Sequence, residues 1–237
     1  MTASDGQGVD AWTDASAYNN DGTQTTSSAQ PTFTTGALNG NPVLRFDGSD
    51  DELEIGDAAS LNTGGEPYLQ RALSFVVTTG ADVSGRQVIY EEGGGARGFN
   101  VYLLNGDLYV AGWNNADDDF ADLTGGSGDD PSAPWEDGAD DGFVFVNTSV
   151  STNTTYVVSL FYDVVSGTIE MWLNGRSTGS ASGAGRQYDH GGDIFIGSDG
   201  DGTFFEDGSG GSGTDFLSGD VAALSFTDAS LNETQRT

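Results

Sequence analysis

Residues 99–113 read Phe-Asn-Val-Tyr-Leu-Leu-Asn-Gly-Asp-Leu-Tyr-Val-Ala-Gly-Trp, two apolar-rich runs on either side of Asn105-Gly106. Alternate residues of the first run, Phe99, Val101 and Leu103, are all apolar, which is typical of a β-strand with one buried face. Asn-Gly is the preferred pair in a two-residue hairpin turn, because both positions of that turn need positive φ. The stretch therefore predicts an antiparallel β-hairpin.

The same pattern of short apolar runs between clusters of Gly, Asn, Asp and Ser extends along the whole chain. Ser166-Gly167 and Asn174-Gly175 predict further tight turns, and no stretch of ten or more residues has the apolar period of a helix. We expect an all-β fold in which two antiparallel sheets pack as a jelly-roll sandwich. The predicted strands are Val43–Phe46, Glu52–Ile55, Leu73–Thr79, Gln87–Glu91, Phe99–Leu104, Leu108–Trp113, Phe143–Asn147, Tyr156–Asp163, Thr168–Leu173, Asp193–Ile196 and Val221–Phe226.

We expect residues 1–237 to form a single domain, interrupted by a long acidic insert at 114–142. A second loop, Ser198–Ser218, is rich in glycine, and Ala229–Arg236 is expected to form a short terminal helical turn. Long loops in compact domains are commonly functional.

The charge balance of the chain indicates adaptation to a high salt concentration. Thirty-seven acidic residues face seven basic ones, all arginine, for a formal net charge of -30. In dilute buffer such a charge opposes compaction, but at molar salt the Debye length falls to about 3 Å and the repulsion is screened. These observations indicate a halophilic source. They also exclude nucleic acid as a partner, because its phosphates would be repelled.

Other sequence features limit the location and the chemistry. No run approaches the roughly 18 apolar residues of a membrane span, so membrane insertion is not expected. There is no cysteine, which excludes disulfides and thiol chemistry. Met1–Gly6 has neither the basic nor the apolar region of a secretory leader. We expect an extracellular or cell-surface domain whose leader has been removed, or alternatively a virion-surface protein released on lysis.

The chain resembles the laminin-G-like branch of the concanavalin A-like lectin/glucanase superfamily. The resemblance is carried by Trp12-Thr13-Asp14-Ala15-Ser16, Asn19-Asn20, Thr23-Gln24 and Ala37–Gly48, the last of which contains Asn39-Gly40-Asn41-Pro42 and Arg45-Phe46-Asp47-Gly48. Asp193–Gly197 and Phe216–Phe226 resemble later strands of the same fold. The resemblance implies a concanavalin A-like sandwich, and it leaves the function open.

The same superfamily includes glucanases, which place a carboxylate pair about 5 Å apart on one strand face. The expected Glu-x-Asp-x-x-Glu pattern is missing, because Glu91-Glu92 runs into glycines and Glu136-Asp137 lies in a loop. We therefore expect no enzymatic activity.

Calcium is the inorganic partner that the sequence favours, since it binds six to eight oxygen ligands. Asp47, Asp50 and Asp51 form the best cluster, and the resemblance implies a cation near this turn and near Asp220. An ordinary hydrated acidic surface is the equally weighted alternative.

Sugar sites combine an exposed aromatic ring with amide or carboxylate groups. Trp113 with Asn114 and Asn115, and Trp135 inside the insert, fit that description, although a tryptophan at a strand end is more commonly part of the core.

The sequence thus predicts a non-catalytic recognition or adhesion domain that binds a glycan or a glycoprotein at its loop rim. The alternative is a structural subunit of a surface assembly, such as a virion decoration, turret or tail protein or a cell-surface filament, packed against neighbouring subunits. A glycoside hydrolase is the third and weakest possibility.

Overall fold

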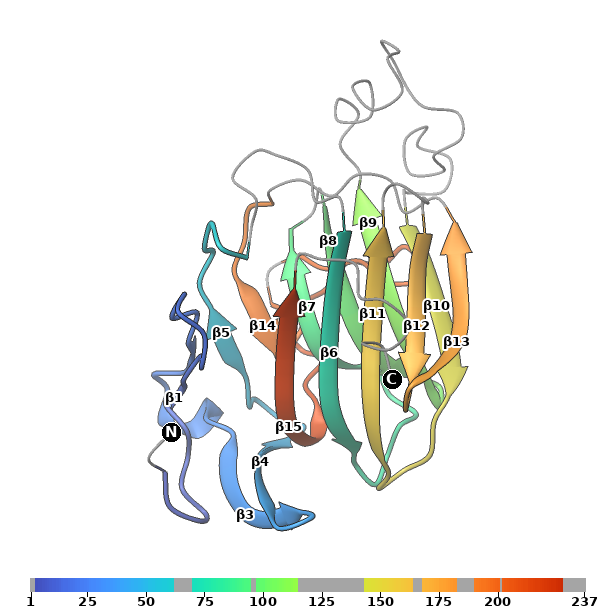
Figure 1. The fold of residues 1–237 in the computed structure, drawn as a ribbon. Coiled ribbons are helices and arrows are strands. Elements are labelled where there is room, and N and C mark those ends of the chain that lie inside the picture. Colours follow the sequence, from blue (N-terminus) through green and yellow to red (C-terminus); the bar gives the residue numbers. More distant parts are fainter. Residues whose placement is uncertain are drawn as a thin grey trace.

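A computed structural model of the chain describes residues 3–61, 70–94, 97–114, 143–163, 168–182, 190–200 and 202–227. These residues form two antiparallel sheets of eight and seven strands that face each other (Figure 1). The predicted all-β jelly-roll sandwich is confirmed. In the described part of the chain, no helix is long and apolar enough to cross a lipid bilayer.

The eight-stranded sheet has the order β1-β2-β5-β14-β7-β8-β9-β10. Its strands are β1 (Ala11–Trp12), β2 (Gly22–Thr23), β5 (Leu53–Ile55), β14 (Ile194–Ile196), β7 (Gln87–Gly93), β8 (Arg97–Leu104), β9 (Asp107–Asn114) and β10 (Phe143–Ser149).

The seven-stranded sheet has the order β13-β12-β11-β6-β15-β4-β3. Its strands are β13 (Arg176–Ser182), β12 (Thr168–Leu173), β11 (Thr155–Asp163), β6 (Gln70–Thr79), β15 (Ser218–Thr227), β4 (Asn41–Asp47) and β3 (Thr32–Leu38). A single turn of 3-10 helix, Ser27–Ala29, precedes β3.

Two of the predicted hairpin turns lie where they were expected. Strands β8 and β9 pair from Leu104 opposite Asp107, with Asn105 at φ 53° and Gly106 at φ 84° between them. Asn174 and Gly175 join β12 to β13 with φ values of 52° and 74°. Ser166-Gly167 and the predicted turn at 229–236 lie outside the described residues.

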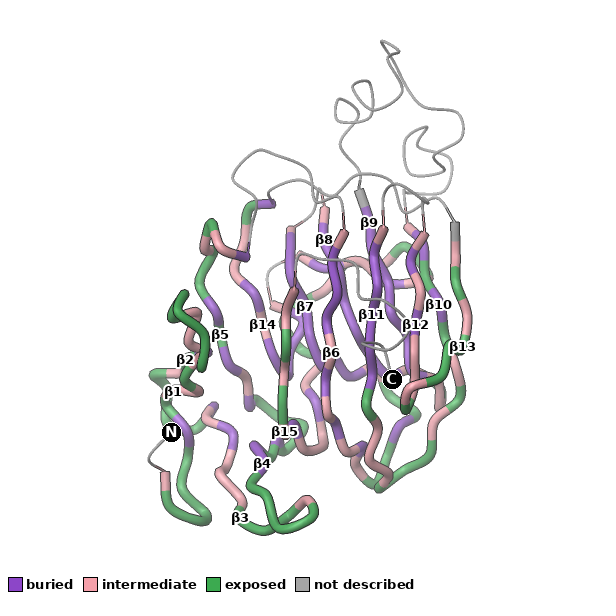
Figure 2. The backbone as a smooth tube through the Cα atoms, viewed as in Figure 1, coloured by how far each residue is buried: buried purple, intermediate pink, exposed green. Residues whose placement is uncertain are grey.

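The core lies between the sheets and follows the strand alternation that the sequence shows (Figure 2). Phe99, Val101 and Leu103 of β8 point inward and are almost fully buried. Aromatic contacts link the two sheets, with ring centroids 5.2 Å apart in the tilted pair Phe75–Tyr90 and in the edge-to-face pair Phe99–Tyr162. Burying one such side chain contributes roughly 1.5–3 kcal/mol, so the aromatic residues supply much of the stability of this acidic chain.

One ion pair crosses the interior. Arg71 of β6 contacts the Glu92 carboxylate of β7, and both side chains are fully buried. Arg71 also donates to the backbone oxygen of Leu61, and the Tyr90 hydroxyl donates to Glu92. A buried charge is tolerated only when it is paired and hydrogen-bonded, and this cluster meets that condition.

The glycine-rich loop at 198–216 covers the outer face of the eight-stranded sheet. Its Phe205 is fully buried against Tyr102, with ring centroids 5.1 Å apart. The buried Asp199 carboxylate accepts the backbone N–H groups of Ser212, Gly213 and Asp215 at 2.6–3.0 Å. These bonds hold the loop closed on itself, so Asp199 has a structural role.

Strand β15 changes neighbours along its length. Residues 218–221 pair with β4 on one side, and the last of these pairs is Val221 with Leu44. Pairing with β6 on the other side continues to Thr227, across a register shift between Val221 and Ala223. Among the described strands, 222–227 therefore have a ladder partner on one side only.

Candidate functional site

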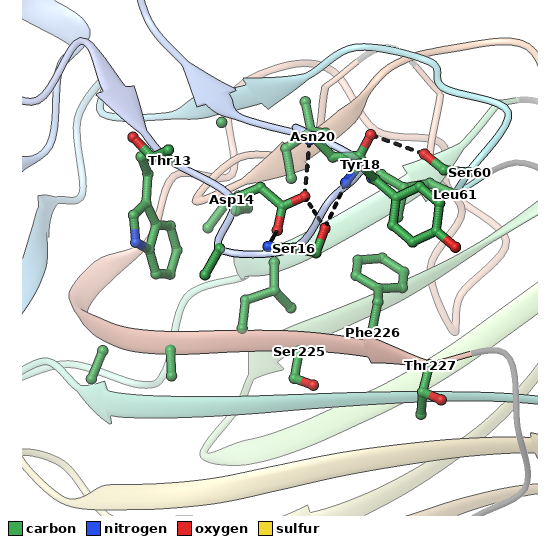
Figure 3. A pocket seen from close by; sticks show the side chains of 18 residues that line it. Thr13, Asp14, Ser16, Tyr18, Asn20, Ser60, Leu61, Ser225, Phe226 and Thr227 are labelled. Atoms are coloured by element: carbon green, nitrogen blue, oxygen red, sulfur yellow. Dashed lines mark hydrogen bonds between the residues drawn. The ribbon is translucent and has the colours of Figure 1, made fainter. Parts of the chain in front are cut away.

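A pocket of about 610 Å³ lies beside residues 222–227 of β15 (Figure 3). One wall is the second half of β15, and the opposite wall is the loop at residues 13–20 between β1 and β2. The volume falls within the range of about 300–1,000 Å³ that small-molecule sites span. The described lining residues are Trp12, Thr13, Asp14, Ala15, Ser16, Tyr18, Asn20, Gly22, Ile55, Ser60, Leu61, Ile196, Ala222, Ala223, Leu224, Ser225, Phe226 and Thr227.

Asp14 organises the loop wall. One carboxylate oxygen accepts the Ser16 N–H at 2.8 Å, and the other accepts the Ser16 hydroxyl at 2.5 Å and the Asn20 N–H at 3.0 Å. Because these donors favour the charged form, the pKa of Asp14 lies below its ordinary value. The Asp14 N–H in turn donates to Asp21 at 2.7 Å. The loop therefore has a defined shape, and Asp14 stays ionised.

The same loop presents an aromatic ring to solvent. Tyr18 is 70% exposed, the highest value among the large hydrophobic side chains described. Its N–H donates to the Ser16 hydroxyl at 3.1 Å, which fixes the base of the side chain. Asn20 accepts a hydrogen bond from the Ser60 hydroxyl at 3.0 Å and so ties the loop to the segment after β5.

The floor of the pocket is apolar. It is formed by side chains that also belong to the core or pack against it: Trp12, Ile55, Leu61, Ile196, Leu224 and Phe226. Figure 3 shows Phe226 pointing from β15 towards the loop, while Ser225 and Thr227 lie on the other side of the strand. Successive strand residues point to opposite faces, so Ser225 and Thr227 border the pocket mainly through their backbone.

Behind the floor lies the buried ion pair. The Arg71 guanidinium sits over the Phe226 ring at 4.9 Å, and the backbone oxygen of Leu61 accepts from Arg71. The Tyr90 ring packs edge-on against Phe226 at 5.6 Å. The pocket floor is thus backed by a fully buried and hydrogen-bonded cluster.

The arrangement suits a small polar molecule that has one apolar face. The exposed Tyr18 ring offers a stacking surface, and hydroxyl and amide groups line the loop side. Main-chain groups of 222–227 on the side of β15 that has no ladder partner among the described strands can add hydrogen bonds. A few placed polar groups around an apolar floor are typical of ligand sites.

The prediction that Trp113 contacts a sugar needs a correction. Trp113 lies on the outer face of the eight-stranded sheet, as a platform would, but its side chain is fully buried. The indole N–H donates to the Gly94 oxygen at 2.8 Å, and Phe204 packs over the ring at 6.2 Å. Gly98 leaves room for it, because a Cβ there would approach the indole to 2.4 Å. Trp113 is a core residue beneath loop 198–216 in this conformation.

The other residues predicted to contact a sugar are Asn114, Asn115 and Trp135. Asn114 is the last residue of β9 and pairs with Arg97 across the sheet. Asn115 and Trp135, with the rest of the insert at 115–142, lie outside the described residues.

The predicted aspartate cluster does assemble. Carboxylate oxygens of Asp47, Asp50 and Asp51 all lie within 4.8 Å of one another. Asp51 is only 5% exposed, and it accepts the Asp47 N–H at 2.9 Å. Desolvation, reinforced by the charges of Asp47 and Asp50, raises the pKa of Asp51 to about 6. Three carboxylates at this spacing are the donor set that a hard cation such as Ca²⁺ takes.

Asp220, which we expected near the same cation, has a different partner. It lies opposite Arg45 in the β15–β4 ladder, and its two oxygens accept from the guanidinium at 2.7 and 2.9 Å. This two-pronged ion pair occupies both oxygens, and Asp220 is not part of the described aspartate cluster.

Glu91 and Glu92 of β7 do not form a pair of the glucanase kind. Glu92 lies opposite Phe99 and points into the sandwich, whereas Glu91 lies opposite Asn100 on the outer face. Both are fully buried. Carboxylates on opposite faces of one strand cannot flank the same glycosidic bond.

Sequence reasoning did not single out the pocket. Asp14, Ser16 and Asn20 entered only as residues that carry the family resemblance, and Tyr18 was not considered. The available signal was the run of Asp, Ser and Asn around one tyrosine in a turn-rich segment, because such side chains fold loops onto themselves. What that signal could not supply is the opposite wall, which lies more than 200 residues away in β15.

No family model matches the sequence, and no curated protein matches it. Solved structures do resemble the fold. The binding domain of botulinum neurotoxin serotype D superposes with a TM-score of 0.58 at 11% identity over 97% of this chain. A native heptameric SAP-like pentraxin from Limulus polyphemus superposes with a TM-score of 0.51 at 14% identity, covering 81% of this chain and 78% of the pentraxin.

A further structure is the serotype D ligand-binding domain in complex with N-acetylneuraminic acid, with a TM-score of 0.54 at 12% identity. The chain covers 49% of each of the two serotype D chains. At these identities the likeness concerns the fold alone, a jelly-roll sandwich that also occurs in receptor-binding domains and pentraxins.

Proposed function

We propose that this chain is a non-catalytic recognition domain that binds a glycan in the pocket between loop 13–20 and β15. The observation that carries the proposal is the pocket itself, where an exposed Tyr18 and ordered polar groups stand over an apolar floor. Pyranose rings present one apolar face and a rim of hydroxyls, so this combination is complementary to a sugar. The occurrence of the same fold in a domain crystallised with N-acetylneuraminic acid supports the choice of ligand class.

The context proposed for the domain is the outside of a halophilic cell, or of a virus that infects one. The formal net charge of -30 with no lysine supports the halophilic part. The motifs around Trp12–Asn20 and Arg45–Gly48 support placing the domain in the laminin-G-like branch of the fold. Opposed, buried Glu91 and Glu92 support a role without catalysis.

A structural subunit of a surface assembly is the competing function. Subunit packing usually uses a contiguous apolar surface. In the described part of the chain, the large exposed apolar side chains are Tyr18 of loop 13–20, Phe145 of β10 and Val157 of β11. This scattering favours ligand recognition over subunit packing. Sedimentation at molar salt tests the alternative, which requires a defined oligomer.

We also propose that Asp47, Asp50 and Asp51 hold a calcium ion. The support is their mutual spacing, within 4.8 Å, and the burial of one member. A bound cation would compensate the charge that Asp51 carries in a poorly hydrated position.

A glycan array probed at molar NaCl tests the glycan proposal. Wild-type protein is expected to retain a defined set of glycans. Tyr18→Ala should lose them, because it removes the exposed ring without disturbing the core. Phe145→Ala is the matched control, an exposed aromatic residue on β10 outside the pocket lining, and it should bind as wild type does. Failure of wild type to bind any glycan would overturn the proposal.

A further inference from the structure

The pocket contains few ionisable side chains. Among its described lining residues only Asp14 and Tyr18 can titrate, and none is Arg, Lys or His. The Asp14 carboxylate is turned to its own loop, where three hydrogen bonds from Ser16 and Asn20 occupy it. Arg71, whose guanidinium lies over the Phe226 ring, is fully buried and paired with Glu92. Among the described residues that line the pocket, a ligand carboxylate would therefore find no cationic partner.

The charge of the whole chain acts in the same direction. At low ionic strength a net charge of -30 repels an anionic ligand. At molar salt this long-range term is screened within about 3 Å. The lack of a cation among the described lining residues then remains as the local reason for rejecting an anion, because a carboxylate taken out of water needs hydrogen-bonded compensation.

The apolar floor favours one kind of ligand substituent over another. Leu61, Ile196 and Phe226 offer no hydrogen-bonding side-chain atom to a hydroxyl that points at them. A hydroxyl buried there would lose its water without gaining a partner, whereas a methyl group would be buried favourably. The polar groups of the pocket lie on the opposite wall, in loop 13–20, where ring hydroxyls can reach them.

We infer that the pocket takes an uncharged sugar bearing a methyl-containing substituent, such as the N-acetyl group of an N-acetylhexosamine, and rejects sugar acids. This inference rests on the proposed glycan-binding function and specifies its ligand. The methyl lies on the apolar floor, the ring stacks on Tyr18, and the hydroxyls bond to the loop and to the main chain of 222–227. The preference differs from the acidic sugar, N-acetylneuraminic acid, found with one structural neighbour.

Calorimetric titration at molar NaCl with matched methyl glycosides tests both parts. The N-acetylglucosaminide should bind at least about tenfold more tightly than the glucoside, since one methyl-sized group in an apolar pocket commonly changes affinity by that factor or more. The methyl ester of the N-acetylneuraminic acid glycoside should bind at least about tenfold more tightly than the free acid. Equal affinity within either pair overturns the corresponding part of the inference while leaving glycan binding intact. Binding of none of the four glycosides overturns this ligand assignment, whereas an empty glycan array defeats the proposed function itself.

A pair of arginine variants tests directly whether the lack of a cation among the described lining residues causes the rejection of sugar acids. Ala15 is exposed and lines the pocket, while Ala17 is exposed in the same loop outside the lining. Ala15→Arg should raise affinity for the free sugar acid at least about tenfold and leave the ester unchanged. Ala17→Arg changes the net charge equally and should leave both ligands as in wild type. Equal gains in the two variants, or no gain in Ala15→Arg, would contradict the inference.

Discussion

The buried carboxylate of Asp51 should contribute a stability penalty that is present at neutral pH and absent at acidic pH. Its pKa in the folded chain is about 6 against an ordinary 3.8, mainly because burial penalises the charged form. A raised carboxyl pKa means that the folded state binds the proton more tightly than the unfolded state. The penalty is therefore absent below about pH 3.8, develops as pH rises, and is complete above about pH 6.

Asp51→Asn removes this penalty while keeping an oxygen that can accept the Asp47 N–H. At about 1.4 kcal/mol per pKa unit, the shift corresponds to about 3 kcal/mol above pH 7. For a chain of this size that is a rise in melting temperature of about 6–12 °C. The variant should gain this stability at pH 8 in the presence of a chelator, and almost none of it at pH 4.

Chemical unfolding in a fixed molar concentration of NaCl provides the assay, because the Debye length must stay constant across the pH series. Asp50→Asn is the matched control, since it removes one charge from the same cluster at an exposed position. It should gain less than about 1 kcal/mol. The reasoning is refuted if Asp51→Asn is no more stable than wild type at pH 8, or if its gain is the same at pH 4.

Three further predictions concern the metal, the buried ion pair and the salt. Calcium at a hundred times its dissociation constant should stabilise wild type by about 2.7 kcal/mol but not Asp51→Asn, as thermal scans with Ca²⁺ or chelator will report, and equal shifts would exclude the proposed site. Arg71→Met should destabilise by about 3–5 kcal/mol because it leaves Glu92 buried without its cation, and adding Glu92→Leu should recover most of the loss; no recovery in denaturant titrations would contradict this. Lowering NaCl from about 3 M to about 0.1 M should reduce the melting temperature, and a melting temperature independent of salt would argue against halophilic adaptation.

The strands that the sequence predicted are those that alternate and face the core. Phe99–Leu104 and Leu108–Trp113 became β8 and β9 because alternation and an Asn-Gly turn are local signals. Strands β3 and β13, Thr32–Leu38 and Arg176–Ser182, were not predicted. Both are edge strands of the seven-stranded sheet. An edge strand has a neighbouring strand on one side only, so small polar residues suffice there and the apolar alternation is weak.

The candidate site was less predictable for a physical reason. The aspartates at 47, 50 and 51 are neighbours in sequence, so their assembly could be predicted locally. The exposure of Trp113 was predicted wrongly because its ring is covered by Phe204, which belongs to a loop that is distant in sequence. The pocket depends on a register shift in β15 and on the point where β4 leaves it, and no local pattern encodes either.

An NMR titration of backbone amides at molar NaCl tests the central claim most directly. The ligand is the best-bound glycan from the array, and the expected result is saturable shifts confined to the loop at residues 13–20 and to 222–227 of β15, both of which border the pocket. Tyr18→Ala should abolish these shifts. Saturable shifts elsewhere with none in these two segments would contradict the placement of the site, and no saturable shift anywhere would contradict glycan recognition by this domain.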